Sequence, residues 1–471
     1  MTIDTKAAPA RGTDDSDEAI PIVHVIRGQV VTGRDRIYRS RDLGAPLAAP
    51  AADLNSWVFP RHEPQPALNL PIGEVFAFLE ELGSRLQLDR NDHLRRAHDL
   101  AGRVNVLGAK ALAGGYRSLG TFFRRDYMEA EYIAALGSLN DGWRDVTRPD
   151  GSQMRVRPFP ARILHVLAGN APGMAATAIV RGSLSRGVHL LKLPSNDLFT
   201  GPAILATMAE IDASHPLVQS FSAVYWRGGE QQIESALFRP QFFDKIMAWG
   251  GGDAIANVQK YMSPGLELVS LDPKTSISII GREAFASHQS LMEAAAGAGI
   301  DVGSQEACGS SRVQFVEGSV EEVDRYCAEL LDQLRYQAEV AGGGRMTPPD
   351  LREEVDALRL LDPEYRVWGE PNGRGLVVRS ETPVDFDLIS RTVNVVPVQN
   401  AIDAARYVNV ATQTVGVYPA ARKAELRDAL CAGGAQRVTT LGTSGMRPSF
   451  GRPHDGFYPL NRMVRWVAEE D

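Results

Sequence analysis

The sequence is poor in cysteine and lacks long apolar segments. Its 471 residues include only three cysteines, Cys308, Cys327 and Cys431, which form neither a disulfide framework nor a metal-ligand cluster. Such sparse cysteine is typical of the reducing cytoplasm, and a cytoplasmic location is expected. There is no apolar run of the length that a membrane span needs, and the N-terminus has no apolar signal core. We therefore expect no metal site and no membrane span.

Strongly basic stretches are also lacking. The net charge of −8 disfavours a general nucleic-acid binder. The apolar content of 44% is ordinary for a globular protein, and 471 residues suffice for two or three domains. Residues 1–20 are rich in Ala, Asp, Thr and Pro, and we predict a disordered tail there.

The segment that follows mixes short strands and helices. Residues 21–26 and 29–32 flank a turn at Arg27-Gly28 and predict a hairpin. Apolar residues recur every three or four positions over residues 72–138, and this spacing predicts helices there. Strand signals at 143–147 and 154–158, with a turn between them, predict a ribbon that protrudes from the domain.

From residue 162 short apolar runs alternate with helical segments. The predicted strands are 163–167, 188–193, 221–225, 243–248, 267–271 and 277–280. Apolar strands with Gly-rich exits into helices indicate a parallel sheet. This pattern predicts that residues 21–281 form the N-terminal helices, the ribbon and a dinucleotide-binding domain.

A second α/β domain is predicted over residues 282–441. It contains helices at 289–298 and 320–340, with strands at 313–316, 375–378, 393–397, 415–418 and 437–441. The remaining segment, 442–471, is rich in Gly, Pro and Arg and ends in a predicted strand at 463–467.

The second domain carries the stretch Asp301-Val-Gly-Ser-Gln-Glu-Ala-Cys308-Gly-Ser-Ser-Arg312, which runs into the strand at 313–316. Small residues let the backbone approach a substrate closely. A cysteine in such a turn is a candidate nucleophile, because covalent catalysis needs a polarisable atom beside oxyanion donors. The alternative is that Cys308 is a small buried apolar residue.

Polar and glycine residues follow the strands of the first domain. Ligands of parallel sheets bind at the carboxyl ends of the strands. The candidates there are Asn170, Lys192, Gly228, Gly229, Gly250, Gly251 and Gly252. Lys192 ends an apolar strand, where an anionic or hydroxyl partner would satisfy it. The alternatives are a solvent-facing lysine, a turn-capping asparagine and plain tight turns.

Taken together, these features resemble the aldehyde dehydrogenase superfamily. The motifs that carry the resemblance are Leu167-Ala-Gly-Asn170, Leu190-Leu-Lys-Leu-Pro-Ser195, Gln305-Glu-Ala-Cys308 and the Gly-rich stretch Thr443 to Gly456. Within the superfamily the chain is most similar to the LuxC-type acyl-CoA reductases. The features for this are Ala307-Cys308-Gly-Ser, Leu271-Asp-Pro-Lys-Thr-Ser276 and Gly451-Arg-Pro-His-Asp-Gly456 with Arg465-Trp-Val467.

The resemblance implies a fold, a reaction and partners. It implies an NADPH- or NADH-dependent reduction of acyl-CoA to aldehyde, reversible as a CoA-acylating oxidation. Cys308 would be the nucleophile and Asn170 an oxyanion donor. Lys192 and the glycine turns would hold the coenzyme, with Arg227 near a 2′-phosphate. A homo-oligomer formed through the ribbon and the C-terminal strand, and an acyl-transfer partner protein, are also expected.

The chain departs from the superfamily at two motifs. The glutamate that primes water in hydrolytic members is missing from Ser270-Leu-Asp-Pro-Lys274. Without that base an acyl-enzyme would survive until a thiol such as coenzyme A arrives. The motif that positions the nicotinamide ribose falls on Val393-Asn-Val-Val-Pro397, without its Glu and Phe. Two alternatives stay open: a hydrolytic enzyme with Asp272 as base, and a non-catalytic scaffold.

The remaining histidines and cysteines have weaker signals. His454 lies in the C-terminal motif and is a candidate proton shuttle, the alternative being a loop histidine bonded to backbone. We predict structural roles for His165 and His288, and packing roles for Cys327 and Cys431.

Overall fold

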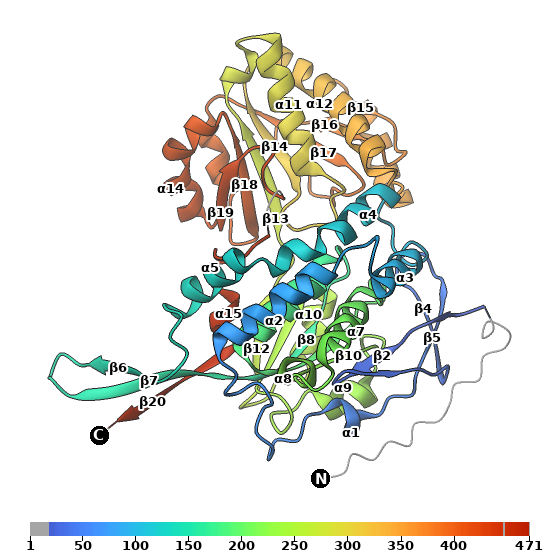
Figure 1. The fold of residues 1–471 in the computed structure, drawn as a ribbon. Helices are drawn as coiled ribbons and strands as arrows, with labels where there is room; N and C mark the ends of the chain where they lie inside the picture. The colour runs from blue at the N-terminus through green and yellow to red at the C-terminus, as the bar shows by residue number, and fades with distance from the viewer. Residues whose placement is uncertain (1–17, 446–447, 471) are drawn as a thin grey trace. The chain divides into compact units, whose positions relative to one another are not determined.

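The computed structural model describes residues 18–445 and 448–470. They fall into two compact units (Figure 1). The first unit comprises Met1–Asn105, Leu112–Asp272 and Ser449–Asp471, and the second comprises Val106–Ala111 and Pro273–Pro448. Most of the predicted disordered tail, residues 1–17, lies outside the described residues.

The first unit contains a seven-stranded sheet of order β12-β11-β8-β9-β10-β2-β3. Its parallel strands are β8 (Arg162–Val166), β9 (Val188–Lys192), β10 (Phe221–Val224), β11 (Lys245–Trp249) and β12 (Glu267–Leu271). An antiparallel hairpin of β2 (His24–Ile26) and β3 (Gln29–Val31) extends the β10 edge. Strands β8 to β11 are buried along their whole length, which explains why most of their residues are apolar.

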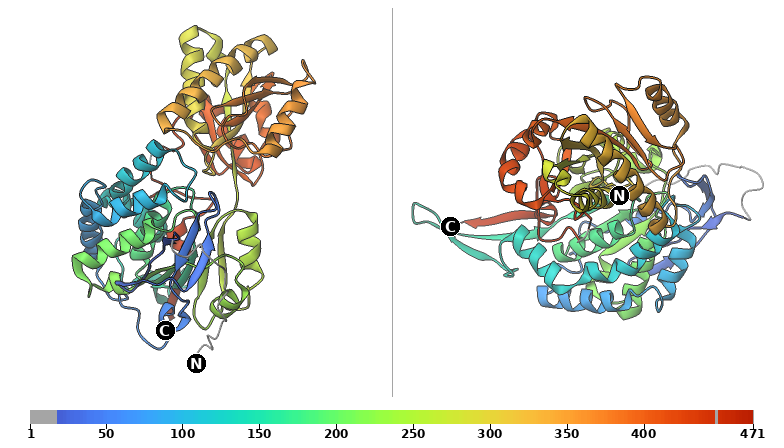
Figure 2. Two further views of the ribbon diagram at one scale, coloured as in Figure 1. Left: turned by 90° about the vertical axis from the view of Figure 1, so that its right-hand side faces the viewer. Right: turned by 90° about the horizontal axis from the view of Figure 1, so that it is seen from above.

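Helices alternate with these strands and form further layers (Figures 1 and 2). The connecting helices are α6 (Gly173–Ser185), α7 (Thr200–Asp212), α8 (Pro216–Gln219), α9 (Gln231–Leu237) and α10 (Gly252–Gln259). The N-terminal helices are α1 (Leu54–Trp57), α2 (Ile72–Arg85), α3 (Asp92–Ala101), α4 (Ala109–Ser118), η1 (Leu119–Phe123) and α5 (Arg125–Leu136). Of these, α2, α3 and α5 pack against α6 or α7.

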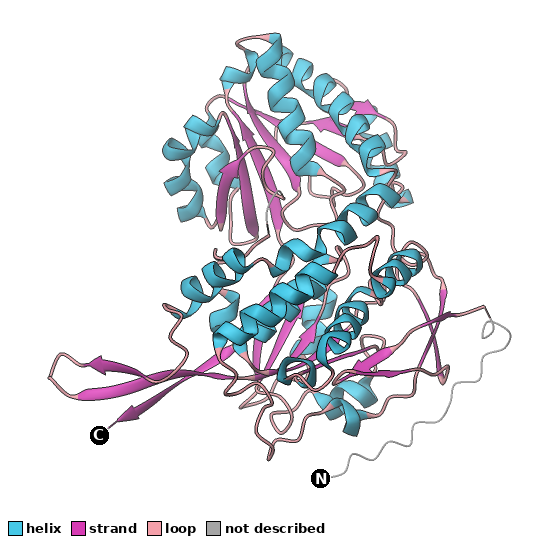
Figure 3. Cartoon of the chain, in the orientation of Figure 1, coloured by secondary structure: helices cyan, strands magenta, loops and turns pink. Residues whose placement is uncertain are grey.

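Two small sheets complete the first unit. One has the order β1-β5-β4, from β1 (Ile20–Pro21), β4 (Arg36–Arg39) and β5 (Pro46–Ala49). The other is the predicted ribbon, in which β7 (Gln153–Pro160) pairs antiparallel with β6 (Arg144–Thr147) and β20 (Val464–Glu470). This ribbon extends away from the rest of its unit (Figure 3). After Val464 every described residue of β20 is exposed.

A buried ion pair fastens the returning C-terminal segment to the first unit. Arg181 on α6 and Glu131 on α5 meet at 2.7 Å, and both side chains are 1% exposed. The Glu131 carboxylate also accepts a hydrogen bond from the backbone N–H of Gly451 at 2.7 Å. The Arg181 guanidinium donates to the carbonyl of Ser449 at 3.3 Å. Residues 449–451, which precede α15 (Pro459–Arg462) and β20, are thereby held by charges on two helices.

The second unit has a seven-stranded sheet of order β15-β16-β17-β14-β13-β18-β19. Its strands are β13 (Thr275–Ile280), β14 (Ser311–Glu317), β15 (Arg366–Gly369), β16 (Leu376–Arg379), β17 (Thr392–Val398), β18 (Thr412–Tyr418) and β19 (Arg437–Thr440). All neighbours pair in parallel except β15, which is antiparallel to β16.

Both faces of this sheet are covered. One core cluster joins alternate strand residues to α11 (His288–Val302) and α12 (Val320–Ala341). Another joins the intervening strand residues to η3 (Ala401–Tyr407) and α14 (Lys423–Gly433). Helix α13 (Pro349–Arg359) packs with β15, and short 3-10 turns occur at η2 (Arg282–Phe285) and η4 (Ala420–Arg422).

The sequence assigns one strand to the wrong sheet. Residues 277–280 are predicted to end the first sheet, but they belong to β13, which lies between β14 and β18 in the second unit. The units divide after Asp272 and Pro448, whereas the sequence places the boundaries after residues 281 and 441. An apolar run identifies a buried strand, but the sheet it joins depends on distant pairing partners.

Candidate active site

Cys308 lies in the second unit, in the turn between α11 and β14, and is half-buried. Gln305 fixes the start of this turn with a left-handed backbone, φ 59°. Its buried amide pairs with the backbone of Thr392, donating to the carbonyl at 2.8 Å and accepting from the N–H at 3.0 Å. The Oγ of Ser276 donates to the carbonyl of Cys308 at 2.7 Å. The turn is thus held at both ends by groups that are remote in sequence.

Two β-bulges flank Cys308. Ser276 of β13 is opposite Ser311 of β14, but the next residue, Ile277, is already opposite Val313. On the other side Thr275 is opposite Thr412, while Ile277 is opposite Val415. Strands β14 and β18 therefore each carry one additional residue at the same level of the sheet. Bulges re-aim side chains and are common beside active sites.

The bulged segments supply groups to the sulfur. The Nε2 of Gln413, on β18, donates to the Sγ of Cys308 at 3.0 Å. Burial lowers the pKa of Arg312, on β14, and the negative charges of Asp387, Glu306 and Cys308 oppose this. Amide donors and guanidinium groups beside a cysteine stabilise its thiolate, which is the nucleophilic form.

A further cation, Arg437 on β19, interacts electrostatically with Cys308. Burial lowers the pKa of Arg437, and the charges of Asp301 and Cys308 act in the opposite direction. Arg437 donates to the carbonyl of Ser444 at 2.8 Å, and Asp301 accepts hydrogen bonds from the backbone N–H groups of Gly442 and Ser444. The segment that follows β19 is therefore tied to the charges around the cysteine. Gln413, Arg312 and Arg437 are site residues that the motifs did not reveal.

The other two cysteines differ in exposure. Cys327 is buried on α12, and burial raises the pKa of its thiol well above the ordinary value. The packing role predicted for Cys327 fits this position. Cys431 is exposed on α14, so the packing role predicted for it is wrong. Its helix packs against the sheet through Leu426 and Leu430, and residue 431 is on the outer side.

Lys192 lies in the first unit, at the carboxyl end of β9, and is 8% exposed. Burial lowers its pKa to about 8, against the raising effect of Glu234 and Glu230. Its Nζ lies 5.4 Å from the centre of the Trp226 ring. The alternative of a solvent-facing lysine is therefore wrong. A buried ammonium beside an aromatic face is suited to hydrogen-bonding a polar ligand group.

Glu234 organises the turn at Gly228 and Gly229, and the sequence did not single it out. Its buried carboxylate accepts hydrogen bonds from the backbone N–H of Gly229 at 3.0 Å and from the Trp226 indole at 3.2 Å. Gly229 has φ 88°, a conformation that favours glycine. Arg227, before this turn, is exposed. Because the Arg227 side chain is at the surface, it can bind an anionic ligand without breaking a contact in the protein interior.

The exit of β11 combines open space with an unused donor. A Cβ at Gly251 or Gly252 would meet no atom within 4 Å, so protein packing does not explain these glycines. Just before them, the indole N–H of Trp249 is buried and has no hydrogen-bond partner among the described residues. Gly250 borders Ala254 on α10. An open backbone at a helix start suits a phosphate, so these residues fit a nucleotide.

Asn170 follows β8 in the loop that leads to α6 and is half-buried. The loop is tied to the end of β9 by Asn105, another residue that the sequence did not reveal. The Asn105 amide donates to the carbonyls of Gly169 at 3.3 Å and Asn196 at 3.0 Å. A Cβ at Gly169 would lie 1.9 Å from the Asn196 side chain, so only glycine fits there. The carboxyl ends of β8 and β9 are thereby joined.

The remaining candidates are placed as follows. His454 packs edge-on against Trp249, with ring centres 5.4 Å apart, and its Nε2 is 3.7 Å from the Asp455 carboxylate. Asp272, the alternative base, is exposed. His165 is buried and bonded to His189 at 3.0 Å, and burial lowers its pKa to about 3, in keeping with a structural role. His288 is exposed at the start of α11.

Other parts of the predicted motifs are not in a position to bind ligand, or are not described. Residues 393–397 lie within β17, which is buried at Asn394, whose amide donates to the carbonyl of Val378 at 2.9 Å. Met446 and Arg447 of the C-terminal motif lie outside the described residues.

Across residues 18–445 and 448–470, no group of three or more His, Cys, Asp or Glu side chains is arranged to hold a metal ion. In the same ranges, no helix has the length and apolar character needed to cross a bilayer.

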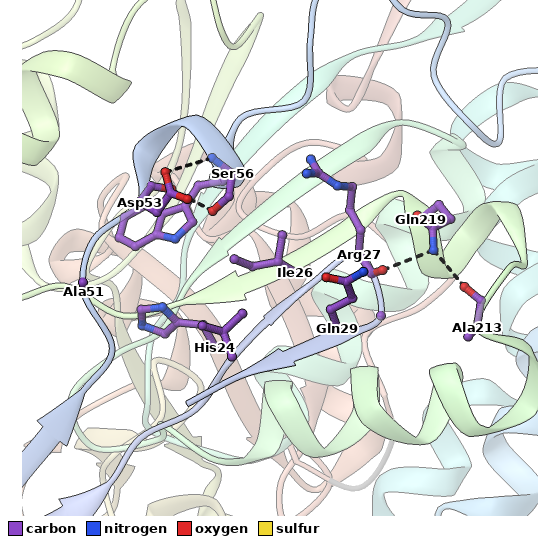
Figure 4. A pocket seen from close by; sticks show the side chains of 12 residues that line it. His24, Ile26, Arg27, Gln29, Ala51, Asp53, Ser56, Ala213 and Gln219 are labelled. Atoms are coloured by element: carbon purple, nitrogen blue, oxygen red, sulfur yellow. Dashed lines mark hydrogen bonds between the residues drawn. The ribbon is translucent and has the colours of Figure 1, made fainter. Parts of the chain in front are cut away.

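A cavity of about 380 Å³ lies beside the β2–β3 hairpin of the first unit (Figure 4). His24, Asp53 and Gln219 are among its lining residues. The Gln219 amide donates to the carbonyls of Arg27 and Ala213, and Asp53 accepts from the N–H of Ser56. None of the predicted site residues lines this cavity, so the candidate site does not include it.

Solved structures define the class of fold. The aldehyde dehydrogenase KauB from Pseudomonas aeruginosa aligns with a TM-score of 0.72 at 14% identity, over 96% of this chain and 97% of that one. An NADP-dependent glyceraldehyde-3-phosphate dehydrogenase from Bacillus halodurans, complexed with NADP, aligns with a TM-score of 0.69 at 13% identity, over 96% and 99%. The chain therefore has the aldehyde dehydrogenase fold, as the sequence predicted.

The family is narrower than the fold. Residues 67–466 match the family model described as acyl-CoA reductase (LuxC), and the chain belongs to this family. A long-chain acyl-protein thioester reductase from Vibrio harveyi is 30% identical over 71% of this chain and 69% of its own length. A protein of the same name from Photobacterium phosphoreum is 28% identical over 85% and 81%. The chain is thus an oxidoreductase that acts on acyl groups and aldehydes, as predicted.

Proposed function

We propose that this protein is an NAD(P)H-dependent reductase that converts an acyl thioester into an aldehyde through an acyl-enzyme on Cys308. The observation that carries the proposal is the 3.0 Å contact between the Gln413 amide and the Cys308 sulfur, with Arg312 and Arg437 interacting electrostatically with the same cysteine. A thiolate in this setting attacks the thioester carbonyl, and the thiol of the substrate leaves. In this proposal Asn170 and the backbone amide of Cys308 would donate to the oxyanion.

The first unit supplies the coenzyme site in this proposal. Lys192 would bond a ribose hydroxyl, and the open backbone at Gly228 and at Gly251–Gly252 would receive the phosphates. Arg227 would attract a 2′-phosphate, which makes NADPH an expected coenzyme beside NADH. When bound, the reduced coenzyme supplies the hydride that converts the acyl group to an aldehyde. His454, packed on Trp249, remains a candidate proton shuttle.

The acyl donor is a thioester. We propose acyl-CoA, in line with the name of the family, and the same attack would accept an acyl group on a partner protein's thiol. The names of the bacterial relatives refer to acyl-protein thioesters, which supports an acyl-transfer partner. With coenzyme A as acceptor the reaction would also run from aldehyde to acyl-CoA. An oligomer built through the exposed edge of β20 is part of the proposal.

A coupled assay tests the proposed function. Acyl-CoAs and aldehydes of different chain lengths are combined with NADPH or NADH, and with NADP⁺, NAD⁺ and coenzyme A, while the nicotinamide absorbance is followed. We expect coenzyme oxidation with acyl-CoA, and aldehyde oxidation that requires coenzyme A. Free acid formed from aldehyde without coenzyme A would instead support a hydrolytic enzyme with Asp272 or another base. No turnover, together with a Cys308 that resists iodoacetamide, would support a non-catalytic scaffold.

Coenzyme affinity should depend on the charge of Lys192. Because burial lowers the pKa of this lysine to about 8, its positive charge is lost as the pH rises through 8. The dissociation constant for NADPH should therefore increase between pH 7 and pH 9. Lys192→Met should weaken binding about 10- to 100-fold at pH 7, since hydrogen bonds to charged groups contribute about 1.5–3 kcal/mol.

Tryptophan-to-nicotinamide energy transfer measures this affinity. Lys260→Met, at an exposed lysine just after α10, is the matched control and should retain wild-type affinity. The Lys192→Met variant should also lose the pH dependence. A variant that binds as tightly as wild type at pH 7 would remove Lys192 from the coenzyme site.

A further inference from the structure

A buried amide, that of Gln413, contacts the sulfur of the candidate nucleophile. The Nε2 of Gln413 is 3.0 Å from the Sγ of Cys308, and Gln413 is 8% exposed. Gln413 lies within the bulge on β18 between Thr412 and Val415. The backbone N–H of Thr414 is bonded to Ser276 Oγ at 3.1 Å, and the same hydroxyl donates to the carbonyl of Cys308. The bulge and the cysteine turn are therefore fixed to one another through Ser276.

We propose that Gln413 is a catalytic residue that stabilises the Cys308 thiolate before acyl transfer and, as an amide, offers the acyl-enzyme no base of its own that could activate water. This inference rests on the proposed function and specifies how its intermediate is protected. An N–H donor stabilises a thiolate as an acceptor, and an amide cannot take a proton from water at neutral pH. At Gln413, Cys308 therefore meets a hydrogen-bond donor and not a base.

The other charges around the sulfur are consistent with this division of roles. Arg312 on β14 and Arg437 on β19 interact with Cys308, and both are cations. Acids interact electrostatically with those cations: Glu306 and Asp387 with Arg312, and Asp301 with Arg437. Glu306 is also 3.9 Å from Arg345. The side chain of β18 that contacts Sγ is thus a neutral donor, and the two arginines add positive charge near the cysteine.

Two substitutions separate the roles of the amide. Gln413→Leu removes the donor and introduces no base, whereas Gln413→Glu removes the donor and introduces a carboxylate of the same size. With Gln413→Glu, that carboxylate would take a proton from water, the water oxygen would bond to the acyl carbon, and the carbon–sulfur bond would break. The products would be the free acid and the Cys308 thiolate, with no change in oxidation state. The variant would therefore divert the intermediate to hydrolysis.

The first readout is the pH dependence of Cys308 alkylation by iodoacetamide, in a Cys431→Ser background because Cys431 is exposed. Both variants should shift the midpoint to higher pH by about one unit or more, which is about a tenfold loss of thiolate at neutral pH. Gln289→Leu, which removes an exposed amide that bonds Glu293 on α11, is the control and should keep the wild-type profile. A Gln413→Leu profile identical to that of wild type would overturn the thiolate role.

The second readout is the lifetime of the acyl-enzyme formed from an acyl-CoA without coenzyme. Free acid should appear at least about tenfold faster from Gln413→Glu than from wild type, since general bases contribute about 10²–10⁴-fold. Gln413→Leu should hydrolyse no faster than wild type. Equal rates in all three proteins would overturn the protective role. If wild-type Cys308 is never acylated, the proposed function fails, and the alkylation profiles still decide whether Gln413 stabilises the thiolate.

Discussion

Cys308→Ala should lower thioester reduction by at least about a thousandfold and leave NADPH affinity within about a factor of two of wild type. The substitution removes the sulfur that would carry the acyl group. The side chains assigned to the coenzyme lie in the other unit, on the ends of the β9, β10 and β11 strands. Steady-state reduction of an acyl-CoA and a separate coenzyme titration measure the two effects.

The chain offers a matched control for this substitution. Cys431→Ala changes an exposed cysteine on α14 and should keep full activity. Thermal unfolding of both variants verifies that the fold is retained. Residual activity of Cys308→Ala above about a thousandth of wild type would argue against covalent catalysis, because loss of a nucleophile usually costs more than that.

Arg181→Leu should reduce the free energy of unfolding by about 3–5 kcal/mol, because it leaves the buried carboxylate of Glu131 without its cation. Glu131 would keep its bond to the N–H of Gly451, but the C-terminal segment would lose its tie to α6. Urea unfolding followed by circular dichroism measures the loss.

Two further variants separate burial from charge. Arg125→Leu breaks two exposed ion pairs, with Glu129 on α5 and with Glu80 on α2, and should cost less than about 1 kcal/mol for each pair. The double variant Arg181→Leu/Glu131→Leu should recover part of the loss, since no unpaired charge remains. A loss of under about 1 kcal/mol for Arg181→Leu would mean that the pair does not hold this part of the unit together.

Local sequence pattern predicted most of the secondary structure. Strands such as β8 and β9 are mostly apolar because parallel strands are buried on both faces. The ribbon was predicted from two strand signals around a turn, and its third strand from the apolar residues near the C-terminus. The position of β13 was not predictable in this way, since its partners β14 (Ser311–Glu317) and β18 (Thr412–Tyr418) lie far along the chain.

The residues of the candidate site were also predicted only where a local sequence pattern marks them. Cys308 and Lys192 stand at strand ends in motifs of adjacent residues, so their positions follow from the local pattern. Gln413 lies 105 residues after Cys308, and its contact depends on a bulge in β18 that no local pattern announces. Asn105 acts through bonds to backbone groups of distant turns. Such contacts are set by the tertiary fold and have no signature in the sequence around them.

The central claim is that an acyl group is carried on Cys308, and mass spectrometry tests it most directly. The protein is mixed with an acyl-CoA in the absence of coenzyme, quenched in acid and digested. We predict that the peptide containing Cys308 gains the mass of the acyl group, and that added NADPH removes this mass as aldehyde. Aldehyde formation at the wild-type rate with an unmodified Cys308 peptide, or with the acyl group on another residue, would contradict the account.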